Sequence, residues 1–353
     1  MRIGVCYDLR SEYLAMGYSE EETAEFDSEI TIDAICETLS GQGWTPVKIG
    51  GIKKLACALV SGERFDAVFN FCEGMKGLAR EAQVPTLLDA YDIPYVFSDS
   101  LTMALTLDKA MTKHVVRSHG IPTADFVLIE KASDIAKVNL PFPLFLKPVA
   151  EGSGKGVNAK SKVEDRKALA TVARELLRKF NQPVLVETFL CGREFTVGIT
   201  GTGEDAQVLG ITEIVPKAGW VGDGYGFENK ESGWEARLDI VRASHFPEAK
   251  AAGAVALAAW RALRCRDGGR IDIRCDAAGE PHFIEVNPIA GLRPDHSDLC
   301  FIAKYEGLSY RQLMDRIMAS FVKRNPALAA RKISAPMARR ARTPVQAQRR
   351  AAA

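Results

Sequence analysis

The sequence predicts an α/β protein whose first third folds around an open, mostly parallel sheet. Short apolar runs of strand length alternate with stretches of helical period along residues 2–120, which is typical of such sheets. Apolar residues make up 47% of the 353 residues and charged residues 26%, as in ordinary globular proteins. This length allows two or three domains. The longest apolar runs fall short of the ~18 residues that a membrane crossing needs.

The first third carries the strand and helix signals of that sheet. The run "RIGVCYD" at 2–8 is an apolar strand, and the last helix ends at Gly120, just before Pro122. We predict strands at 2–8, 66–71 and 93–97, and helices at 28–41, 77–91 and 100–120.

The rest of the chain changes character. Two strands flank a helix, two further strands have an antiparallel pattern, and a hairpin follows a long helix. The Gly-rich stretch at 216–234 is typical of a loop. We predict strands at 143–149, 183–189, 194–200 and 206–215, helices at 163–180, 247–265 and 309–323, and the hairpin at 269–288.

Cysteine usage and charge narrow the class of protein. The eight cysteines form no CxxC pair, so neither a zinc ribbon nor a redox motif is indicated, and we expect a reducing cytoplasm. The net charge of +1 includes seven cations and no acid in 331–353, so the remainder carries −6. We expect a disordered basic tail at 326–353. The mildly acidic body argues against nucleic acid as a partner.

The hairpin "GRIDIRCDAAGEPHFIEVNP" places polar residues where a sheet face is usually apolar. Because residues two apart share a face, Glu285 and Asn287 point the same way, as do Arg270 and Asp272. If the two faces coincide, the oxygens suit two Mg²⁺ or Mn²⁺ ions better than zinc. The alternative is an exposed strand face with ordinary ion pairs.

Two lysines and a glycine-rich turn indicate a phosphate site. Lys147 follows three apolar residues, a costly place for a charge without an anionic partner, and Lys109 lies between the first and middle segments. The turn "EGSGKGV" matches neither the P-loop nor the GxGxxG spacing, yet its glycines allow close approach of backbone N–H groups. A plain turn and lysines that extend their heads into solvent remain the alternative.

The stretch "VLVETFLCGREFTVGI" offers apolar side chains and bare backbone between Glu187 and Glu194. This composition suits the flat edge of a purine. A strand, a turn and a second strand with no ligand would have the same pattern.

Taken in order, four segments resemble the ATP-grasp ligases, and more narrowly the D-alanine–D-alanine ligase group. The resemblance covers residues 2–323 and rests on the order and spacing of "ALTLDKAMTK", "PLFLKPVAEGSGKGV", "VLVETFLCGREFTV" and "GRIDIRCDAAGEPHFIEVNPIAGL". It implies a ligase that uses ATP to convert one substrate's carboxylate to an acyl phosphate, which the amine of a second substrate then attacks.

The resemblance also implies roles for individual residues that contact ATP. Phosphates would be held by Lys109 and Lys147, and the loop that covers them would contain Ser153. The adenine would meet Glu187 and the backbone near Leu190, and the ribose would meet Glu194. From a further loop, Lys230 would reach the γ-phosphate.

The remaining roles concern metal ions and the reacting atoms. The resemblance implies that Asp272, Glu285 and Asn287 bind two Mg²⁺ or Mn²⁺ ions. Arg270 would stabilise the acyl phosphate and the tetrahedral intermediate, and the backbone N–H of Gly291 would lie beside the developing oxyanion.

Departures from the family pattern lie in the substrate pocket. The first loop normally carries GGxSxE, whose Glu receives an ammonium group; here Asp27 is the best positional match and Glu29 the second. The HGxxGED segment is replaced by "NFCEGMKGLAREAQ", with Glu73 and no His. Together with the departures that follow, these changes argue against specificity for D-alanine and leave the use of ATP untouched, unless they reflect drift in loops.

Two further departures lie later in the chain. The family's Lys–Tyr step is Lys230–Glu231 here, and "NPIAGLRPDHSDL" replaces a shorter Ser/Thr-rich turn. We therefore add four residues to the candidates for substrate contact: Glu231, Arg293, His296 and Ser297.

The resemblance implies three α/β domains of ATP-grasp type. We expect an N-terminal domain at 1–105, a central lid at 106–190 and a catalytic core at 191–325. Expected partners are ATP and small amino-acid-like substrates, with no membrane and with a homodimer as one possible assembly. Three alternatives stay open: a ligase for a pair other than D-alanine, a kinase-like enzyme that stops at phosphoryl transfer, and a non-catalytic ATP-binding regulator.

Overall fold

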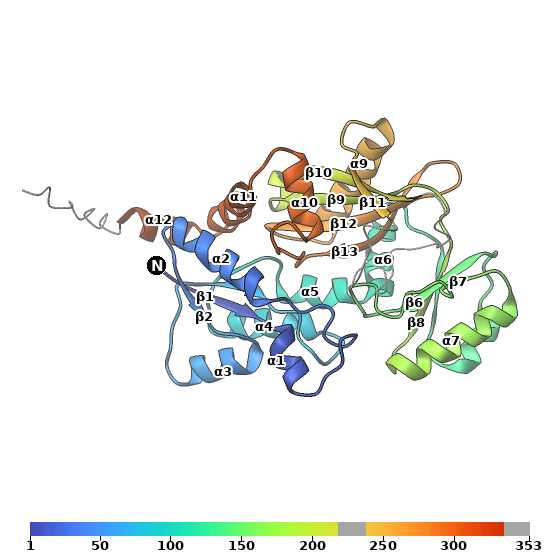
Figure 1. Ribbon diagram of the computed structural model, residues 1–353, viewed down its shortest axis with the longest axis horizontal. Coiled ribbons are helices and arrows are strands. Elements are labelled where there is room, and N and C mark those ends of the chain that lie inside the picture. Colours follow the sequence, from blue (N-terminus) through green and yellow to red (C-terminus); the bar gives the residue numbers. More distant parts are fainter. Residues whose placement is uncertain (218–237, 335–353) are drawn as a thin grey trace, which may run out of the picture.

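The computed structural model describes residues 1–217 and 238–334, which form three sheets with helices packed around them. Figure 1 shows the sheet of β1–β4 next to the N-terminus, the sheet with β9–β13 beside it, and the sheet with β6–β8 at the opposite end. None of the described helices has both the length and the apolar character for a membrane crossing.

The N-terminal sheet is parallel throughout, as the sequence predicts. Its strand order is β2-β1-β3-β4, and every pair within it is parallel. Its strands are β1 (Arg2–Tyr7), β2 (Thr45–Lys48), β3 (Ala67–Phe71) and β4 (Tyr95–Val96). Its helices are α1 (Arg10–Ala15), α2 (Glu29–Gly41), α3 (Ile52–Val60), the 3-10 turn η1 (Arg80–Ala82) and α4 (Gln83–Ala90).

The single helix predicted at 100–120 is wrong, because the chain forms two helices there. They are α5 (Ser100–Leu107) and α6 (Lys109–Ser118), and Asp108 between them is extended. The Asp108 carboxylate accepts a hydrogen bond from the Met111 backbone N–H, so it acts as the N-cap of α6. The break places Lys109 at the first position of α6.

The middle sheet is antiparallel, with strand order β5-β8-β6-β7. One helix packs on it and buries Leu169, Ala173 and Leu176, which lie on one helical face. The elements are β5 (Phe126–Ile129), η2 (Ala132–Lys137), β6 (Leu144–Pro148), β7 (Lys162–Val163), α7 (Arg166–Phe180) and β8 (Val184–Thr188).

The C-terminal sheet is also antiparallel, with strand order β11-β10-β9-β12-β13. It contains the predicted hairpin and the predicted pair at 194–215. Helix α9 lies against it with a row of buried alanines, which allow close packing, and with Trp260. The elements are β9 (Glu194–Thr200), η3 (Gly203–Asp205), β10 (Gln207–Pro216), β11 (Leu238–Arg242), α9 (Pro247–Ala262), β12 (Gly268–Cys275) and β13 (Pro281–Asn287).

The last described helices are α10 (Asp298–Tyr305), α11 (Tyr310–Lys323) and α12 (Pro326–Ser334). The sequence predicts only α11 of these. Helix α12 lies within the stretch expected to be a disordered tail, so the helical part of the chain extends to Ser334, and 335–353 lie outside the described residues.

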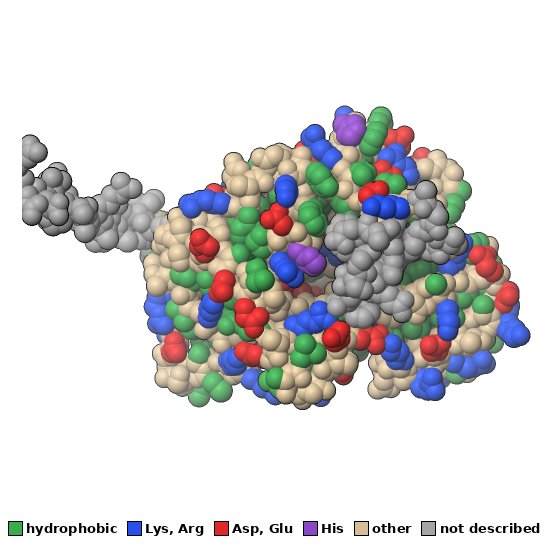
Figure 2. Space-filling model, viewed as in Figure 1, with side chains coloured by type: hydrophobic (Ala, Val, Ile, Leu, Met, Phe, Trp, Pro, Cys, Tyr) green, Lys and Arg blue, Asp and Glu red, His purple; other side chains and the backbone are tan. Residues whose placement is uncertain are grey.

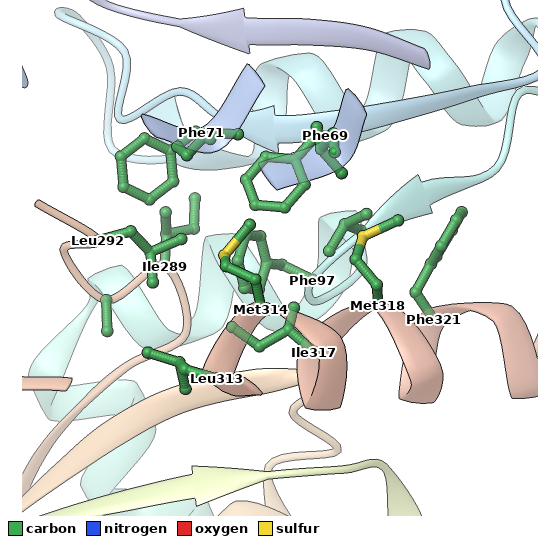
Figure 3. Packing of buried hydrophobic residues seen from close by; sticks show 14 of the residues in the cluster. Phe69, Phe71, Phe97, Ile289, Leu292, Leu313, Met314, Ile317, Met318 and Phe321 are labelled. Atoms are coloured by element: carbon green, nitrogen blue, oxygen red, sulfur yellow. The ribbon is translucent and has the colours of Figure 1, made fainter. Parts of the chain in front are cut away.

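Helix α11 joins the end of the chain to the first sheet. It contributes Leu313, Met314 and Ile317 to a buried cluster with Phe69 of β3 and Phe97 after β4 (Figure 3). The N-terminal sheet therefore shares a hydrophobic core with a helix more than 200 residues away in the sequence.

A buried aspartate fixes the same junction. Asp267 is 0% exposed and accepts hydrogen bonds from the Phe97 backbone N–H at 2.8 Å and the Ser320 hydroxyl at 2.9 Å. Arg324 donates to it at 2.7 and 3.0 Å and to the Tyr95 carbonyl at 2.5 Å. One carboxylate thus ties the end of β4 to the end of α11.

Positive and negative side chains are mixed over the described part of the face shown in Figure 2, with no extended patch of either sign.

Candidate active site

The hairpin β12–β13 carries the polar cluster that the sequence predicts. Its register places Arg270 opposite Asn287 and Asp272 opposite Glu285. Directly opposed residues on antiparallel strands point to the same face, so these four side chains share one face. A β-bulge follows Asp272, and such bulges often re-aim side chains near active sites.

Cations lie next to both carboxylates of this cluster. Arg270 donates to the two oxygens of Asp272 at 2.7 and 2.6 Å, and its Nε lies 3.6 Å from Asp298 Oδ2. Lys109 Nζ lies 3.5 Å from Glu285 Oε2. Sequence reasoning missed Asp298, because it lies in the first turn of α10, which was not predicted.

The oxygen donors of the cluster fit a magnesium or manganese ion. Asp272 and Glu285 offer carboxylates, and Asn287 offers an amide whose nitrogen is buried without a hydrogen-bond partner. Within 1–217 and 238–334, no three His, Cys, Asp or Glu side chains are close enough to hold a metal ion. The set therefore depends on the Asn287 oxygen, and on water or phosphate oxygens to complete the shell.

Glu187 of β8 lies between two lysines. Its carboxylate lies 2.5 Å from Lys113 Nζ and 3.0 Å from Lys147 Nζ, and the residue is 3% exposed. Burial alone would raise the pKa of Glu187, but the two ammonium groups hold it below its ordinary value. Despite its own burial, Lys147 keeps a raised pKa because of Glu187 and Glu285. Lys113 is a partner that sequence reasoning missed.

A first cavity of about 120 Å³ is lined by residues of the middle and C-terminal sheets. Its apolar lining includes Phe145, Leu190, Ile214 and Ile284, which provide flat surfaces for a ring. The predicted nucleotide contacts that line it are Lys109, Lys147, Glu187, Leu190 and Glu194.

Glu194 does not stand alone in this cavity. Its carboxylate lies 3.4 Å from Arg274 of β12, and both residues line the cavity. Arg274 was also not predicted, because the strand pairing that places it opposite Glu194 joins residues 80 apart in the sequence.

The glycine-rich turn adopts the conformations that its glycines permit. Gly154 and Gly156 have φ values of 71° and 75°, in the left-handed region, and Ser153 also lies there at 51°. A Cβ at Gly156 would lie 2.6 Å from Pro148 Cγ, so the turn also needs glycine for space. The Gly152 backbone N–H donates to Glu25 at 2.6 Å.

A second cavity of about 130 Å³ lies beside the first. Lys109, Glu151, Arg270 and Glu285 line both, so the face of the hairpin borders both spaces. Of the predicted residues, the second cavity also contains Asp27, Glu73, Ser153, Asn287 and Gly291 in its lining.

Two glutamates in this lining were missed by sequence reasoning. Glu25 pairs with Arg80 at 3.1 Å and Lys155 at 3.2 Å, and Glu81 lies in the turn η1. Glu25 stands two residues before Asp27 in the acidic first loop, and "REA" contains Arg80 and Glu81, so composition was the only available signal.

Burial raises the pKa of three carboxyl groups in the second cavity. It raises the pKa of Asp27 to about 6 and that of Glu81 to about 7. The pKa of Glu73 is raised well above its ordinary value by burial and then by the charges of Glu81 and Glu25.

Several predicted residues lie elsewhere. Arg293, His296 and Ser297 line neither cavity, although the charge of Arg293 acts on Asp27. The Ser297 hydroxyl instead accepts a hydrogen bond from the Arg293 backbone N–H. Glu29, the second match in the first loop, is exposed and accepts a hydrogen bond from Ser11.

Two predicted residues cannot be placed. Lys230 and Glu231 lie outside the described residues.

Known proteins are similar to this chain in sequence and in fold. The family described as D-ala D-ala ligase C-terminus matches residues 115–319. A D-alanine–D-alanine ligase from Bordetella petrii is 34% identical over 259 residues, which are 72% of this chain and 76% of that relative.

Solved structures share the fold of this chain. The VanG D-Ala:D-Ser ligase from Enterococcus faecalis has a TM-score of 0.70 at 22% identity, covering 91% of this chain and 99% of its own. The D-alanine–D-alanine ligase from Bacillus anthracis complexed with ATP has a TM-score of 0.67 at 21% identity, covering 93% and 99%. The fold is therefore the predicted ATP-grasp fold, and this chain belongs to the D-alanine–D-alanine ligase family of ATP-dependent ligases.

Proposed function

We propose that this protein joins a carboxylate to an amine through an acyl phosphate formed from ATP. The observation that supports this most is that the two cavities share one wall. Lys109, Arg270 and Glu285 line both cavities, so a phosphate chain in the first cavity meets a carboxylate in the second at the hairpin face.

The first cavity suits the nucleotide. Lys109 and Lys147 offer ammonium groups to phosphate oxygens, and the backbone near Leu190 offers an edge to the adenine. Glu187 would support the nucleotide through its ion pair with Lys147, and Glu194, which lines the same cavity, would meet the ribose. The ATP in the Bacillus anthracis neighbour supports this use of a shared fold.

The hairpin would hold the metal ions. Asp272, Glu285 and Asn287 provide oxygen ligands for one or two Mg²⁺ or Mn²⁺ ions. When bound, such ions neutralise the charge that develops on a transferring phosphoryl group.

The reaction is a double displacement at phosphorus and then at carbon. A carboxylate oxygen of the first substrate attacks the γ-phosphorus, the bond from that phosphorus to the bridging oxygen breaks, and ADP leaves. The amine nitrogen of the second substrate then attacks the acyl carbon and loses a proton, and inorganic phosphate leaves. Arg270 and the backbone N–H of Gly291 would stabilise the tetrahedral oxyanion, and the position of both residues in the lining of the second cavity supports this role.

D-alanine is the first substrate to test for both positions, because D-alanine is the substrate in the relative's name. A specific observation favours a different pair: the second cavity contains the carboxylates of Glu73 and Glu81, and Glu73 stands where the family pattern has His. The site of action we propose is the cytoplasm, since all eight cysteines are free thiols.

The test measures ADP formation that depends on added D- and L-amino acids, singly and in pairs, with mass analysis of the products. Hydroxylamine should trap the acyl phosphate as a hydroxamate. Asp272→Asn and Glu285→Gln should lower kcat at least a hundredfold while nucleotide binding weakens less, because the ligands act on charge that grows in the transition state.

Matched controls are Asp33→Asn and Glu37→Gln on α2, whose side chains are exposed. Both should turn over at the wild-type rate. Wild-type kcat in either hairpin variant would remove the metal assignment, and ADP formation that never depends on an added carboxylate or amine would remove the ligase assignment.

A further inference from the structure

The second cavity contains a carboxylate that the fold leaves without a partner. Glu81 is 8% exposed and lines this cavity, and in the described part of the chain its side chain makes no hydrogen bond or ion pair. Its neighbour Arg80 is directed to Glu25 and to the Ala150 carbonyl instead. The charges of Arg80, Lys109 and Lys155 act on Glu81, but none of these cations lies within ion-pair distance of its carboxylate. A buried carboxylate without a paired cation is unfavourable, and it is rare unless a ligand supplies one.

Other carboxylates of the same lining are already matched by cations of the chain. Glu25 lies within 3.2 Å of both Arg80 and Lys155. Glu151 lies 2.5 Å from Lys155. Glu285 lies 3.5 Å from Lys109.

Glu73, Asp27 and Glu81 are therefore the excess carboxyl groups of the cavity. None of the three has an ion pair among the described residues. They come from different parts of the N-terminal region: Asp27 lies in the first loop before α2, Glu73 follows β3, and Glu81 lies in η1. Because separate elements converge on one space, the excess does not result from a single acidic stretch exposed to solvent.

The raised pKa values of these three carboxyl groups are consistent with a site that lacks a paired cation until a ligand binds. Burial raises the pKa of each of the three, and the charges of Glu81 and Glu25 raise the pKa of Glu73 further. An ammonium group placed among them would favour their charged forms and would itself gain carboxylate partners.

We infer that the second cavity binds a small substrate with two ammonium groups, a diamino acid or diamine, rather than an amino acid with one. This inference rests on the proposed function, because it assigns the substrate class of the same site. One ammonium group would face one or two of the three carboxylates, and the second would neutralise the rest.

The proposal also gives the substrate a direction. Its reacting end would lie toward Arg270, Asn287 and Gly291, and its cationic end toward Glu73 and Glu81, all of which line the cavity. Substrates that differ only at the end distant from the reacting group should therefore differ in binding.

Ornithine and norvaline form the matched pair for the test, because norvaline has the same carbon chain without the side-chain amine. Calorimetry on the full chain with ADP and Mg²⁺ measures the dissociation constant of each, in both enantiomers, at pH 8. We expect ornithine to bind at least tenfold more tightly than norvaline. Putrescine tests a diamine without a carboxylate.

The variants Glu81→Gln and Glu73→Gln should each reduce that preference at least fivefold while norvaline binding changes less than twofold. Glu37→Gln, an exposed glutamate, serves as the control. Thermal unfolding checks that each variant is folded. Equal binding of ornithine and norvaline by the wild type, or an unchanged preference in both variants, would overturn the inference.

The binding measurement separates this inference from the proposed function. Preferential ornithine binding without amine-dependent ADP formation would contradict the ligase assignment and leave the cation site in place. ADP formation with D-alanine at the same efficiency as with ornithine would leave the ligase in place and contradict the cation site.

Discussion

Two buried carboxylates of this protein have opposite surroundings. Asp267, at the junction of β4 and α11, accepts hydrogen bonds from Arg324, Ser320 and the Phe97 backbone, so the fold satisfies it completely. Glu81, in the second cavity, has no such partner. The difference separates a buried charge that stabilises the fold from one that is available to a ligand.

Glu187 lies between these two cases. It borders the first cavity, yet Lys113 and Lys147 satisfy its charge. We therefore regard Glu187 as the ion-pair partner that positions Lys147, the residue that we propose to bind phosphate.

The largest expected change in stability follows from replacing Asp267. Asp267→Ala should lower the free energy of unfolding by about 3–5 kcal/mol, because it leaves Arg324 without its counter-ion at a buried junction. Urea unfolding followed by tryptophan fluorescence measures the change. A loss below about 1 kcal/mol would mean that the satisfied carboxylate is not what stabilises this junction.

The next largest effect, at Glu81, is a gain in the free energy of unfolding. The pKa of Glu81 is about 7 in the folded state and ordinary, near 4.5, in the unfolded chain. Its ionisation therefore opposes folding progressively as the pH rises from 4.5 through 7. Glu81→Gln should raise the free energy of unfolding at pH 8 by up to about 3 kcal/mol, and leave it nearly unchanged at pH 4.5.

Urea titrations of the wild type and Glu81→Gln at several pH values measure that difference. A variant that is less stable than the wild type at pH 8 would show that Glu81 has a stabilising partner, and the contrast with Asp267 would then be invalid.

A smaller loss of stability is expected when Glu187 is replaced. Glu187→Gln should cost about 1–3 kcal/mol of stability, because Lys113 is 0% exposed but keeps the Thr123 hydroxyl and the Phe283 carbonyl as acceptors. The dissociation constant for ADP should rise as Lys147 loses its support. Unchanged ADP binding at equal folding would show that Glu187 has only a structural role.

The smallest effect is expected at an exposed pair. Lys304 lies 2.7 Å from Asp295, and both side chains are largely in solvent. Lys304→Ala should leave the midpoint of urea unfolding unchanged within error, because solvent screens exposed pairs. A clear shift would mean that burial is not what distinguishes the carboxylates compared above.

The sequence predicts the parts of this site that depend on local periodicity. Alternation along β12 and β13 predicts that Arg270 shares a face with Asp272, and Glu285 with Asn287. Whether these two faces coincide was left open by the sequence, and the register shows that they do. The apolar run around Lys147 predicts that its ammonium group is buried next to an anion, and Glu187 is that anion.

The rest depends on contacts between distant segments. No pattern near Glu25 predicts its pairing with Arg80, because residues 55 apart meet only when the first loop lies over η1. The sequence did not predict the break at Asp108, because the apolar period continues through this residue. The Asp108 carboxylate instead accepts a hydrogen bond from the Met111 backbone N–H, and this local bond competes with a continuous helix. Asp298 was missed together with α10.

The packing of α11 against β3 and Phe97 has a consequence for synthesis on the ribosome. The first sheet emerges early, and α2 gives early apolar cover to the cluster around Phe69, but α11 completes that cover only after residues 310–323 have been translated. Until then part of the cluster is exposed to water, so completing this part of the fold requires the chain to close a very long loop, which slows folding. A nascent chain that stalls before Tyr310 should therefore be a target for chaperones.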